Sequence, residues 1–331
     1  MREAVFSSSS TGFRIRVAQG QAADHELARH GFAGWAERVA TTLFFTFFPA
    51  DCRICGSPLL RVSRLPVCKA CLLALRPLQG SYCTVCGETL HFPAGTVHVE
   101  ADRSENESES ETRCLLCQRA DPPFERAVAY GSYDGGLRDL IHVLKFQQVR
   151  PAAAVLGRML AETIANLEQA MPVGTIAVVP VPLYTRKQAQ RGFNQAEMIA
   201  RSALKQLLHP KRSDPKRFEL CTGVLLRRRE TGSQIGLTRH QRRENLRGAF
   251  AVGDPARLLN RDVLLVDDVY TTGTTASECA RVLRRAGAAR VWVATVARTL
   301  KITDVISLSG HLPEDTSQEG SREATTKTAC A

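Results

Sequence analysis

The residues best suited to chemistry are two adjacent carboxylates, Asp267 and Asp268, which follow the apolar run 263–266. A turn rich in hydroxyls comes next, made of Thr271, Thr272, Gly273, Thr274 and Thr275. In parallel α/β sheets, ligands bind beyond the carboxyl ends of the strands. A helix that begins at such a turn attracts anions through its free N–H groups and its dipole. The carboxylates can bind vicinal hydroxyls or a metal, and the adjacent turn can bind a phosphate. Together they predict a sugar phosphate as the ligand.

The segment from Val263 to Thr275 resembles the phosphoribosyl pyrophosphate (PRPP) signature of type I phosphoribosyltransferases. The resemblance implies that Asp267 and Asp268 are the catalytic carboxylates and face the ribose hydroxyls, with Mg²⁺ bound alongside PRPP. It also implies that the turn wraps the 5′-phosphate. A Walker A loop is excluded, because no Gly-Lys-Ser/Thr follows. A buried strand with a solvated Asp-Asp end explains only part of the pattern.

A second anion site is expected after the strand at 175–181, where the chain becomes basic. Arg186, Lys187 and Arg191 lie around a glycine-containing turn that opens a helix. Arginine binds phosphate through two parallel N–H groups and lysine binds it as a point charge. These three residues are candidates for the diphosphate. Lys145, at the end of a predicted helix, is a further basic candidate for PRPP, and an ordinary lysine at a helix end is the alternative. A structural role in helix capping is the alternative for Arg191 and Asn194.

The segment from Glu230 to Arg247 is polar and basic and lies between two predicted strands. It resembles the mobile loop that covers the substrate in phosphoribosyltransferases. Closure of such a loop excludes water from a reactive centre. Arg243 and Asn245 are the candidates for contacts made on closure, and a solvated loop without a ligand role is the alternative.

Eight of the 11 cysteines form four Cys-x-x-Cys pairs, which favour metal binding in a chain without an evident secretory signal. We predict two structural Zn²⁺ sites of four thiolates each, in which the first pair joins the second and the third joins the fourth. A cross-braced arrangement and a redox dithiol are the alternatives. The metal-binding residues are Cys52, Cys55, Cys68, Cys71, Cys83, Cys86, Cys114 and Cys117.

The positive charge of the chain is concentrated in one region. The chain carries a formal charge of +11, and residues 186–247 alone hold 16 Lys/Arg and 5 Asp/Glu, a net of 16 − 5 = +11. Such a block suits phosphate-rich partners, either pyrophosphate or nucleic acid. No apolar run reaches the ~20 residues that a membrane span requires. We therefore expect a cytoplasmic protein without a transmembrane segment.

Strands that alternate with helices predict a parallel sheet with helices on both faces. The expected strands are 126–133, 175–181, 263–266 and 290–297, with shorter ones at 224–227 and 248–252. The expected helices are 137–146, 155–167, 195–208 and 274–286. We expect a mobile leader at 1–33, a helix and the cysteine module at 34–120, a phosphoribosyltransferase-like domain at 121–305 and a disordered tail at 306–331. The acidic segment 100–112 reads as an insertion in the cysteine module.

Together these features resemble the ComF family of competence-associated, phosphoribosyltransferase-like proteins. The match runs from about Phe47 to Arg298 and adds four motifs to those above, Phe48-Pro49 before the first cysteine pair, Leu144-Lys145-Phe146, Val179-Pro180-Val181-Pro182-Leu183 and Arg191-Gly192-Phe193-Asn194-Gln195. The resemblance implies a type I phosphoribosyltransferase-like core behind an N-terminal zinc module. It also implies a link to single-stranded DNA and the DNA-uptake machinery in natural transformation. The acidic insertion and the long leader depart from the family pattern.

Three functions fit this sequence. The first is an enzyme that binds PRPP and Mg²⁺ and transfers the phosphoribosyl group to an acceptor. The second is a module that keeps the fold and mainly binds single-stranded DNA, and the third is a regulator that senses PRPP. The sequence does not name the acceptor.

Overall fold

The computed structural model describes residues 50–59, 63–90, 113–208, 217–231 and 238–300. The expected helix at 34–48, the acidic segment 100–112 and both chain ends lie outside these residues. The chain divides into two units, of which one comprises Met1–Cys52 with Gly56–Pro66 and the other Arg53–Cys55 with Val67–Ala331. In the first unit, the Gly56 N–H donates to the carbonyl of Cys52 at 2.8 Å. All helices and strands named below belong to the second unit.

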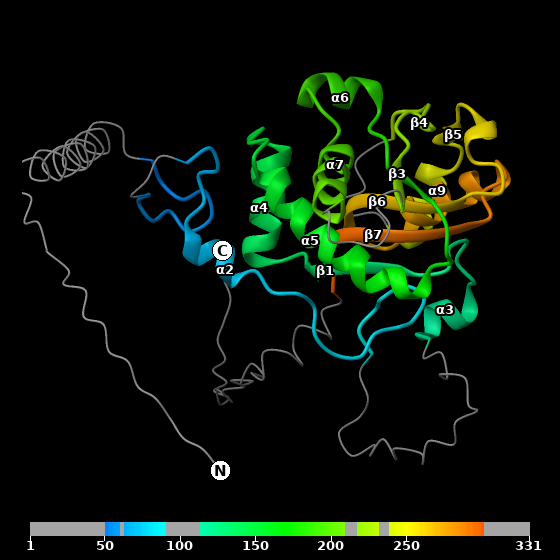
Figure 1. Ribbon diagram of the computed structural model, residues 1–331, viewed down its shortest axis with the longest axis horizontal. Helices are drawn as coiled ribbons and strands as arrows, with labels where there is room; N and C mark the ends of the chain where they lie inside the picture. Colours follow the sequence, from blue (N-terminus) through cyan, green and yellow to red (C-terminus); the bar gives the residue numbers. More distant parts are fainter. Residues whose placement is uncertain (1–49, 60–62, 91–112, 209–216, 232–237, 301–331) are drawn as a thin grey trace, which may run out of the picture. The chain divides into compact units, whose positions relative to one another are not determined.

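Five parallel strands form the main sheet in the order β1-β7-β6-β2-β3 (Figure 1). The central strands are apolar on both sides, as parallel strands covered on both faces must be. Residues 263–266 of β6 are fully buried, for example. The bounds are β1 Ala127–Ser132, β2 Ile176–Pro180, β3 Phe218–Leu220, β6 Asp262–Tyr270 and β7 Arg290–Arg298, and β4 Leu225–Arg227 pairs antiparallel with β5 Phe250–Val252.

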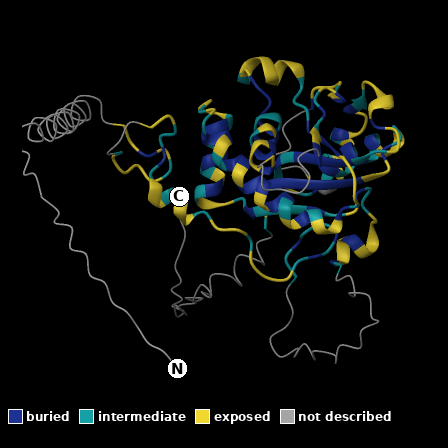
Figure 2. Cartoon of the chain, viewed as in Figure 1, coloured by how far each residue is buried: buried dark blue, intermediate teal, exposed yellow. Residues whose placement is uncertain are grey.

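Helices cover both faces of the sheet. On one face α5 (Ala152–Leu167) and α7 (Gln195–Leu207) pack against each other and against the strands. A Cβ at Gly157 of α5 would overlap Ser202, so this glycine permits the close approach of α7. On the other face α9 (Thr274–Arg285) shares a buried core with alternate residues of β6. Figure 2 shows this core in dark blue between the helices.

The smaller helices lie around these layers. They are α2 Lys69–Ala74, α3 Leu115–Arg119, α4 Gly135–Lys145, α6 Thr185–Arg191 and α8 Arg239–Leu246, with short 3₁₀ turns η1 Glu168–Ala170 and η2 Pro255–Arg257. The predicted fold class, a parallel sheet with helices on both faces and a small cysteine module before it, is confirmed.

Three details differ from the sequence predictions. Strand β3 was not expected, because three residues are too few to show a period. The basic turn expected after β2 is helix α6, which ends at Gly192 in the left-handed region (φ +77°). Strand β6 does not end at Val266 but continues through both carboxylates to Tyr270, because β7 pairs with it along this whole length.

Candidate functional site

The two carboxylates lie where the sheet loses one strand. Strand β2 pairs with β6 as far as Pro180 opposite Val266, whereas β7 still pairs with Asp267. The next N–H that faces the β2 side is that of Asp268, since alternate residues face the same neighbour. This N–H donates to Oδ1 of Asp267 at 2.9 Å. The carboxylates are therefore anchored by strand pairing on one side and stand at an open step on the other.

Asp268 is almost fully buried, with 4% of its surface exposed. Its Oδ2 forms an ion pair with Nζ of Lys145, the last residue of α4. Its Oδ1 accepts a hydrogen bond from Nε2 of Gln195, the first residue of α7, at 3.4 Å. One strand and two helices therefore meet at a single carboxylate.

Asn194 fixes the start of α7 and so places Gln195. Its Oδ1 accepts from the N–H of Ala196 at 3.0 Å, which caps the helix, and its Nδ2 donates to the carbonyl of Val181 at 3.0 Å. Arg191, at the end of α6, donates through Nη1 to Oε1 of Gln195. Arg191 thus reaches the carboxylate pair through Gln195.

The two carboxyl groups differ in acidity. Burial and the neighbouring charge of Asp268 raise the pKa of Asp267 well above its ordinary value. Burial also acts to raise the pKa of Asp268, but the charge of Lys145 and the surrounding hydrogen bonds outweigh it and lower that pKa. The pair therefore carries an ionised Asp268 beside an Asp267 that holds its proton more firmly, and an arriving cation would favour ionisation of both.

The hydroxyl-rich turn begins helix α9. Gly273 is the N-cap and adopts the left-handed region (φ +74°), and a Cβ there would overlap the hydroxyl of Tyr270. The side chains of Thr272 and Thr274 join through their Oγ1 atoms at 2.8 Å. A glycine is therefore required at this position, both by the backbone conformation and by the tyrosine.

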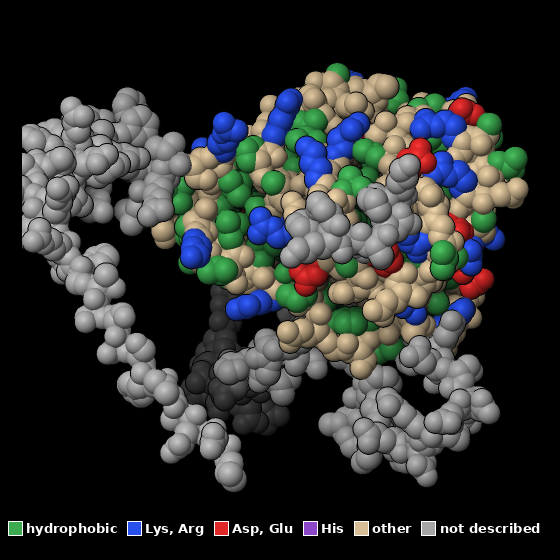
Figure 3. Space-filling model, in the orientation of Figure 1, with side chains coloured by type: hydrophobic (Ala, Val, Ile, Leu, Met, Phe, Trp, Pro, Cys, Tyr) green, Lys and Arg blue, Asp and Glu red, His purple; other side chains and the backbone are tan. Residues whose placement is uncertain are grey.

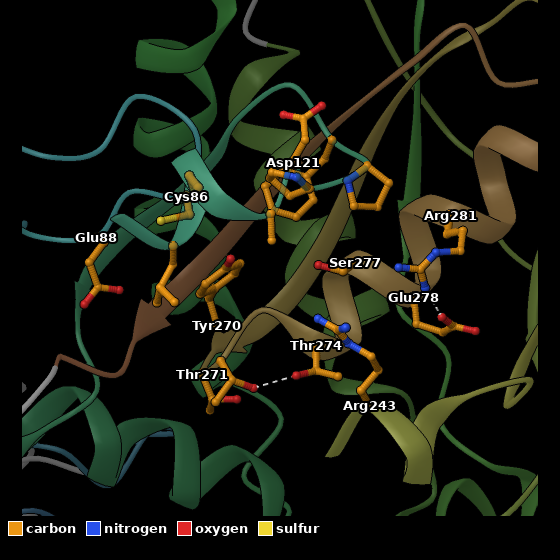
Figure 4. A pocket seen from close by; sticks show the side chains of 17 residues that line it. Cys86, Glu88, Asp121, Arg243, Tyr270, Thr271, Thr274, Ser277, Glu278 and Arg281 are labelled. Carbon is orange, nitrogen blue, oxygen red and sulfur yellow. Dashed lines mark hydrogen bonds and ion pairs between the residues drawn. The ribbon is translucent and has the colours of Figure 1, made fainter. Parts of the chain in front are cut away.

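A cavity of about 120 Å³ opens beside this turn, between α9 and the third and fourth cysteine pairs (Figure 4). Thr271, Thr274 and Ser277 line one side of it. Arg243 of α8 extends toward them, as Figure 4 shows, whereas Arg281 is paired with Glu278. The structure thus brings the predicted residue Arg243 to the turn.

Of the predicted site residues, Asp267, Asp268, Lys145 and Arg191 gather in one cluster, and Arg243 joins the turn. Arg186 and Lys187 are exposed on α6, where Nη1 of Arg186 lies 4.0 Å from Glu230. The carbonyl of Asn245 accepts from Nη2 of Arg229 at 2.8 Å. The loop residues 232–237 lie outside the described part of the chain.

The eight paired cysteines form two groups, and in each group the four sulfurs lie within 4.8 Å of one another. Sγ of Cys55 lies 3.7 Å from that of Cys68, and Sγ of Cys86 lies 3.6 Å from that of Cys114. Four sulfurs at ~2.3 Å around a tetrahedral Zn²⁺ stand about 3.8 Å apart, so both groups fit structural zinc. The first pair joins the second and the third joins the fourth, as predicted, which excludes the cross-braced arrangement.

The second zinc group is joined to the end of the sheet through Arg298, the last residue of β7. Its side chain is 2% exposed. Nη1 donates to the carbonyl of Cys86 at 3.0 Å, and Nη2 pairs with Oε2 of Glu88 at 2.7 Å. The guanidinium also lies over the ring of Tyr270, at 5.6 Å from its centre. A zinc ligand and the turn are therefore both in contact with this one arginine–tyrosine pair.

Three further residues of the site were not predicted from the sequence, namely Gln195, Phe146 and Arg298. Gln195 directly follows the helix cap Asn194 in the motif 191–195, and this position was the only local indication of its role. A charged residue at the end of the apolar strand β7 was the corresponding signal for Arg298. Phe146 directly follows Lys145, and its ring lies under the guanidinium of Arg191 at 5.6 Å.

Comparisons with known proteins cover the first three cysteine pairs and, with the curated relatives, most of the chain. The family model of the double zinc ribbon domain matches residues 43–103. The DNA utilization protein YhgH of Salmonella typhi is 32% identical over 257 residues, which cover 76% of this chain and 98% of that protein. Competence protein F of Haemophilus influenzae is 28% identical over 257 residues, 77% of this chain and 98% of that protein.

Among solved structures, glutamine PRPP amidotransferase from B. subtilis aligns with 44% of this chain at 24% identity and a TM-score of 0.26. The alignment spans 26% of that enzyme. Within the described residues, none of the helices is both long and apolar enough to cross a bilayer.

Proposed function

The chain belongs to the ComF family, and from this premise we propose that it is a phosphoribosyltransferase that binds PRPP and Mg²⁺ at the end of β6. We further propose that it acts in DNA uptake or utilization, as the names of its relatives indicate for those proteins. The observation that carries the proposal is the pair of a half-buried Asp267 and a buried Asp268 at the step of the sheet, followed by the Gly273 turn at the start of α9.

Each part of PRPP meets a matching group in this arrangement. The turn offers free N–H groups and hydroxyls to the 5′-phosphate, and the carboxylates accept hydrogen bonds from the ribose hydroxyls. Arg191 and Lys145, which border the carboxylates, supply positive charge on the side of the diphosphate. Carboxylate oxygens suit Mg²⁺, which would offset the diphosphate charge and so improve it as a leaving group.

The reaction is a substitution at C1 of the ribose. The C1–O bond to the diphosphate breaks and its electron pair leaves with pyrophosphate. The lone pair of the acceptor atom forms the new bond to C1, and the proton that the acceptor loses passes to water or to pyrophosphate. The protein contributes mainly positioning and charge stabilisation around a cationic ribose.

Calorimetric titration of the zinc-loaded protein with PRPP in the presence of Mg²⁺ tests the proposal. We expect the wild type to bind and Asp267→Asn/Asp268→Asn to lose binding. Asp262→Asn is the matched control, because it removes a carboxylate from the opposite end of the same strand, where Asp262 pairs with Arg290. Absence of binding by folded, zinc-loaded wild type would rule out the proposed enzyme.

A second candidate function is binding of single-stranded DNA through the basic surface. Figure 3 shows Lys and Arg side chains spread over the viewed face of the molecule, and the net charge of residues 186–247 equals that of the whole chain. Binding of this kind weakens steeply with salt. Salt-sensitive DNA binding in Asp267→Asn/Asp268→Asn, without release of pyrophosphate by the wild type, would favour this function over the enzyme.

A further inference from the structure

One aromatic side chain stands exposed beside the carboxylate cluster. Phe146 is 67% exposed and caps the C-terminal end of α4, directly after Lys145. Single exposed apolar residues are common on protein surfaces, and Leu73 and Leu259 are each 62% exposed in this chain. What distinguishes Phe146 is the set of groups that holds its ring.

The ring of Phe146 is held from two sides. The guanidinium of Arg191 lies 5.6 Å from its centre, and the ring of His142 meets it edge-on at 5.1 Å. His142 is fixed in turn, since its Nε2 lies 3.0 Å from the hydroxyl of Tyr133. Arg191 is fixed by Gln195, the residue that also contacts Asp268. An exposed phenylalanine on a mobile surface would have none of these supports.

The geometry points to a stacking surface for a planar nitrogen heterocycle, and we propose that Phe146 binds the acceptor base of the phosphoribosyl transfer. The ring is one residue from Lys145 and shares Arg191 with the carboxylate cluster. A base on the exposed part of the ring would therefore lie next to the ribose that we assign to Asp267 and Asp268. Aromatic side chains bind bases through such stacking, and a guanidinium against the ring adds to it.

This inference rests on the proposed function, because that function defines the reaction. Binding of a free base to Phe146 can be tested independently of that function. Phe146→Trp places a fluorescent ring at the site, and titration of the wild type measures the background of the two native tryptophans, Trp35 and Trp292. Free adenine and free uracil are titrated into this variant and into the wild type without PRPP. We expect fluorescence quenching that is specific to the variant.

The affinity of the site is measured by calorimetry with Phe146→Leu, which keeps the apolar bulk and removes the π face. We expect it to bind adenine about tenfold more weakly or worse, in line with the loss of one stacked base. Leu259→Ala, at a similarly exposed position outside the cluster, is the control and should bind adenine as the wild type does.

Two results would overturn the assignment. One is binding of adenine and uracil that is equal in wild type and Phe146→Leu. The other is quenching by single-stranded oligonucleotides but by neither free base, which would assign the ring to a DNA strand. Failure of PRPP binding with retained base binding would instead count against the proposed function alone.

Discussion

Arg298 and Tyr270 face each other in the last register pair of β7 and β6, with the guanidinium 5.6 Å from the centre of the ring. On one side the arginine binds the peptide carbonyl of Cys86 in the second zinc group. On the other side the tyrosine hydroxyl lies against Gly273. The zinc group, the two central strands and the turn therefore share one contact point.

Replacing this arginine should destabilise the protein strongly. Arg298→Met leaves Glu88 buried without the arginine that neutralises it, and loss of one partner of a buried pair costs about 3–5 kcal/mol. Arg290→Met, at the other end of the same strand, removes an exposed pair with Asp262 and should change stability little. Urea denaturation of both variants measures the difference, and equal midpoints would contradict the prediction.

The pair Lys145–Asp268 should behave in the same way, and here both partners can be removed. Lys145→Met leaves a buried carboxylate unpaired and should cost about 3–5 kcal/mol of unfolding free energy. Lys145→Met/Asp268→Asn removes both charges and should recover much of that loss. A double-mutant cycle by chemical denaturation gives the coupling, and a coupling near zero would show that the pair is not stabilising.

Asp267 should make the protein less stable as the pH rises. Its pKa is higher in the folded chain than in the unfolded one, so the folded state binds this proton more tightly. The stability contributed by the proton is complete below the ordinary aspartate pKa of about 3.9 and is lost as the pH rises through the folded pKa. Asp267→Asn cannot lose a proton, so thermal melting at pH 8 should be higher than for wild type, by a few degrees, and the gap should close toward pH 4. Parallel melting curves across this range would refute the assignment.

The turn glycine should tolerate no side chain. Gly273→Ala places a Cβ at positive φ and against the Tyr270 hydroxyl. Gly248→Ala has the same type of backbone conformation (φ +66°), but nothing lies within 4 Å of its Cβ, so it measures the strain alone, about 1–2 kcal/mol. Thermal unfolding should show a larger loss for Gly273→Ala, and only this variant should weaken PRPP binding in calorimetry. Equal losses of stability in the two variants would show that the contact with Tyr270 contributes nothing.

The two zinc groups should differ in what they stabilise. Cys83, Cys114 and Cys117 belong to the buried core that also contains residues of α9 and β6. Cys117→Ser should therefore release zinc and lower the melting temperature of the sheet. Cys71→Ser, from the partly exposed first group, should release zinc with a smaller effect on the sheet. Zinc analysis and circular dichroism on the same samples test this, and equal melting temperatures for the two variants would contradict it.

Much of the site was predictable because its signals are local. The two cysteine groups follow from short spacings, and the carboxylates and the turn lie within 9 consecutive residues, 267–275. Helix α7 and its cap Asn194 likewise follow from an adjacent motif. In each case the residues that act together are neighbours in the sequence, so their pattern can be recognised without knowledge of the fold.

The residues that were missed depend on partners far away in the chain. Gln195 meets Asp268 across 73 residues, and Arg298 meets Glu88 across 210. No periodicity records such a contact, since it arises only when the parallel sheet brings distant strand ends together. The extent of β6 has the same origin, because its last residues are strand only through their pairing with β7.

The hydrogen bond from the Asp268 N–H to Asp267 takes the place of the strand pairing that β2 no longer provides. Beyond Pro180 no residue of β2 pairs with β6, and the carboxylate oxygen of Asp267 accepts from the N–H that faces that side. A ligand that binds this oxygen and breaks the hydrogen bond must itself supply an acceptor for the Asp268 N–H. Otherwise its binding free energy is weaker by about 0.5–1.5 kcal/mol. A ligand with a donor and an acceptor side by side can do both at once, whereas a bare cation cannot. The strand end would in this way favour ligands with paired hydroxyl groups.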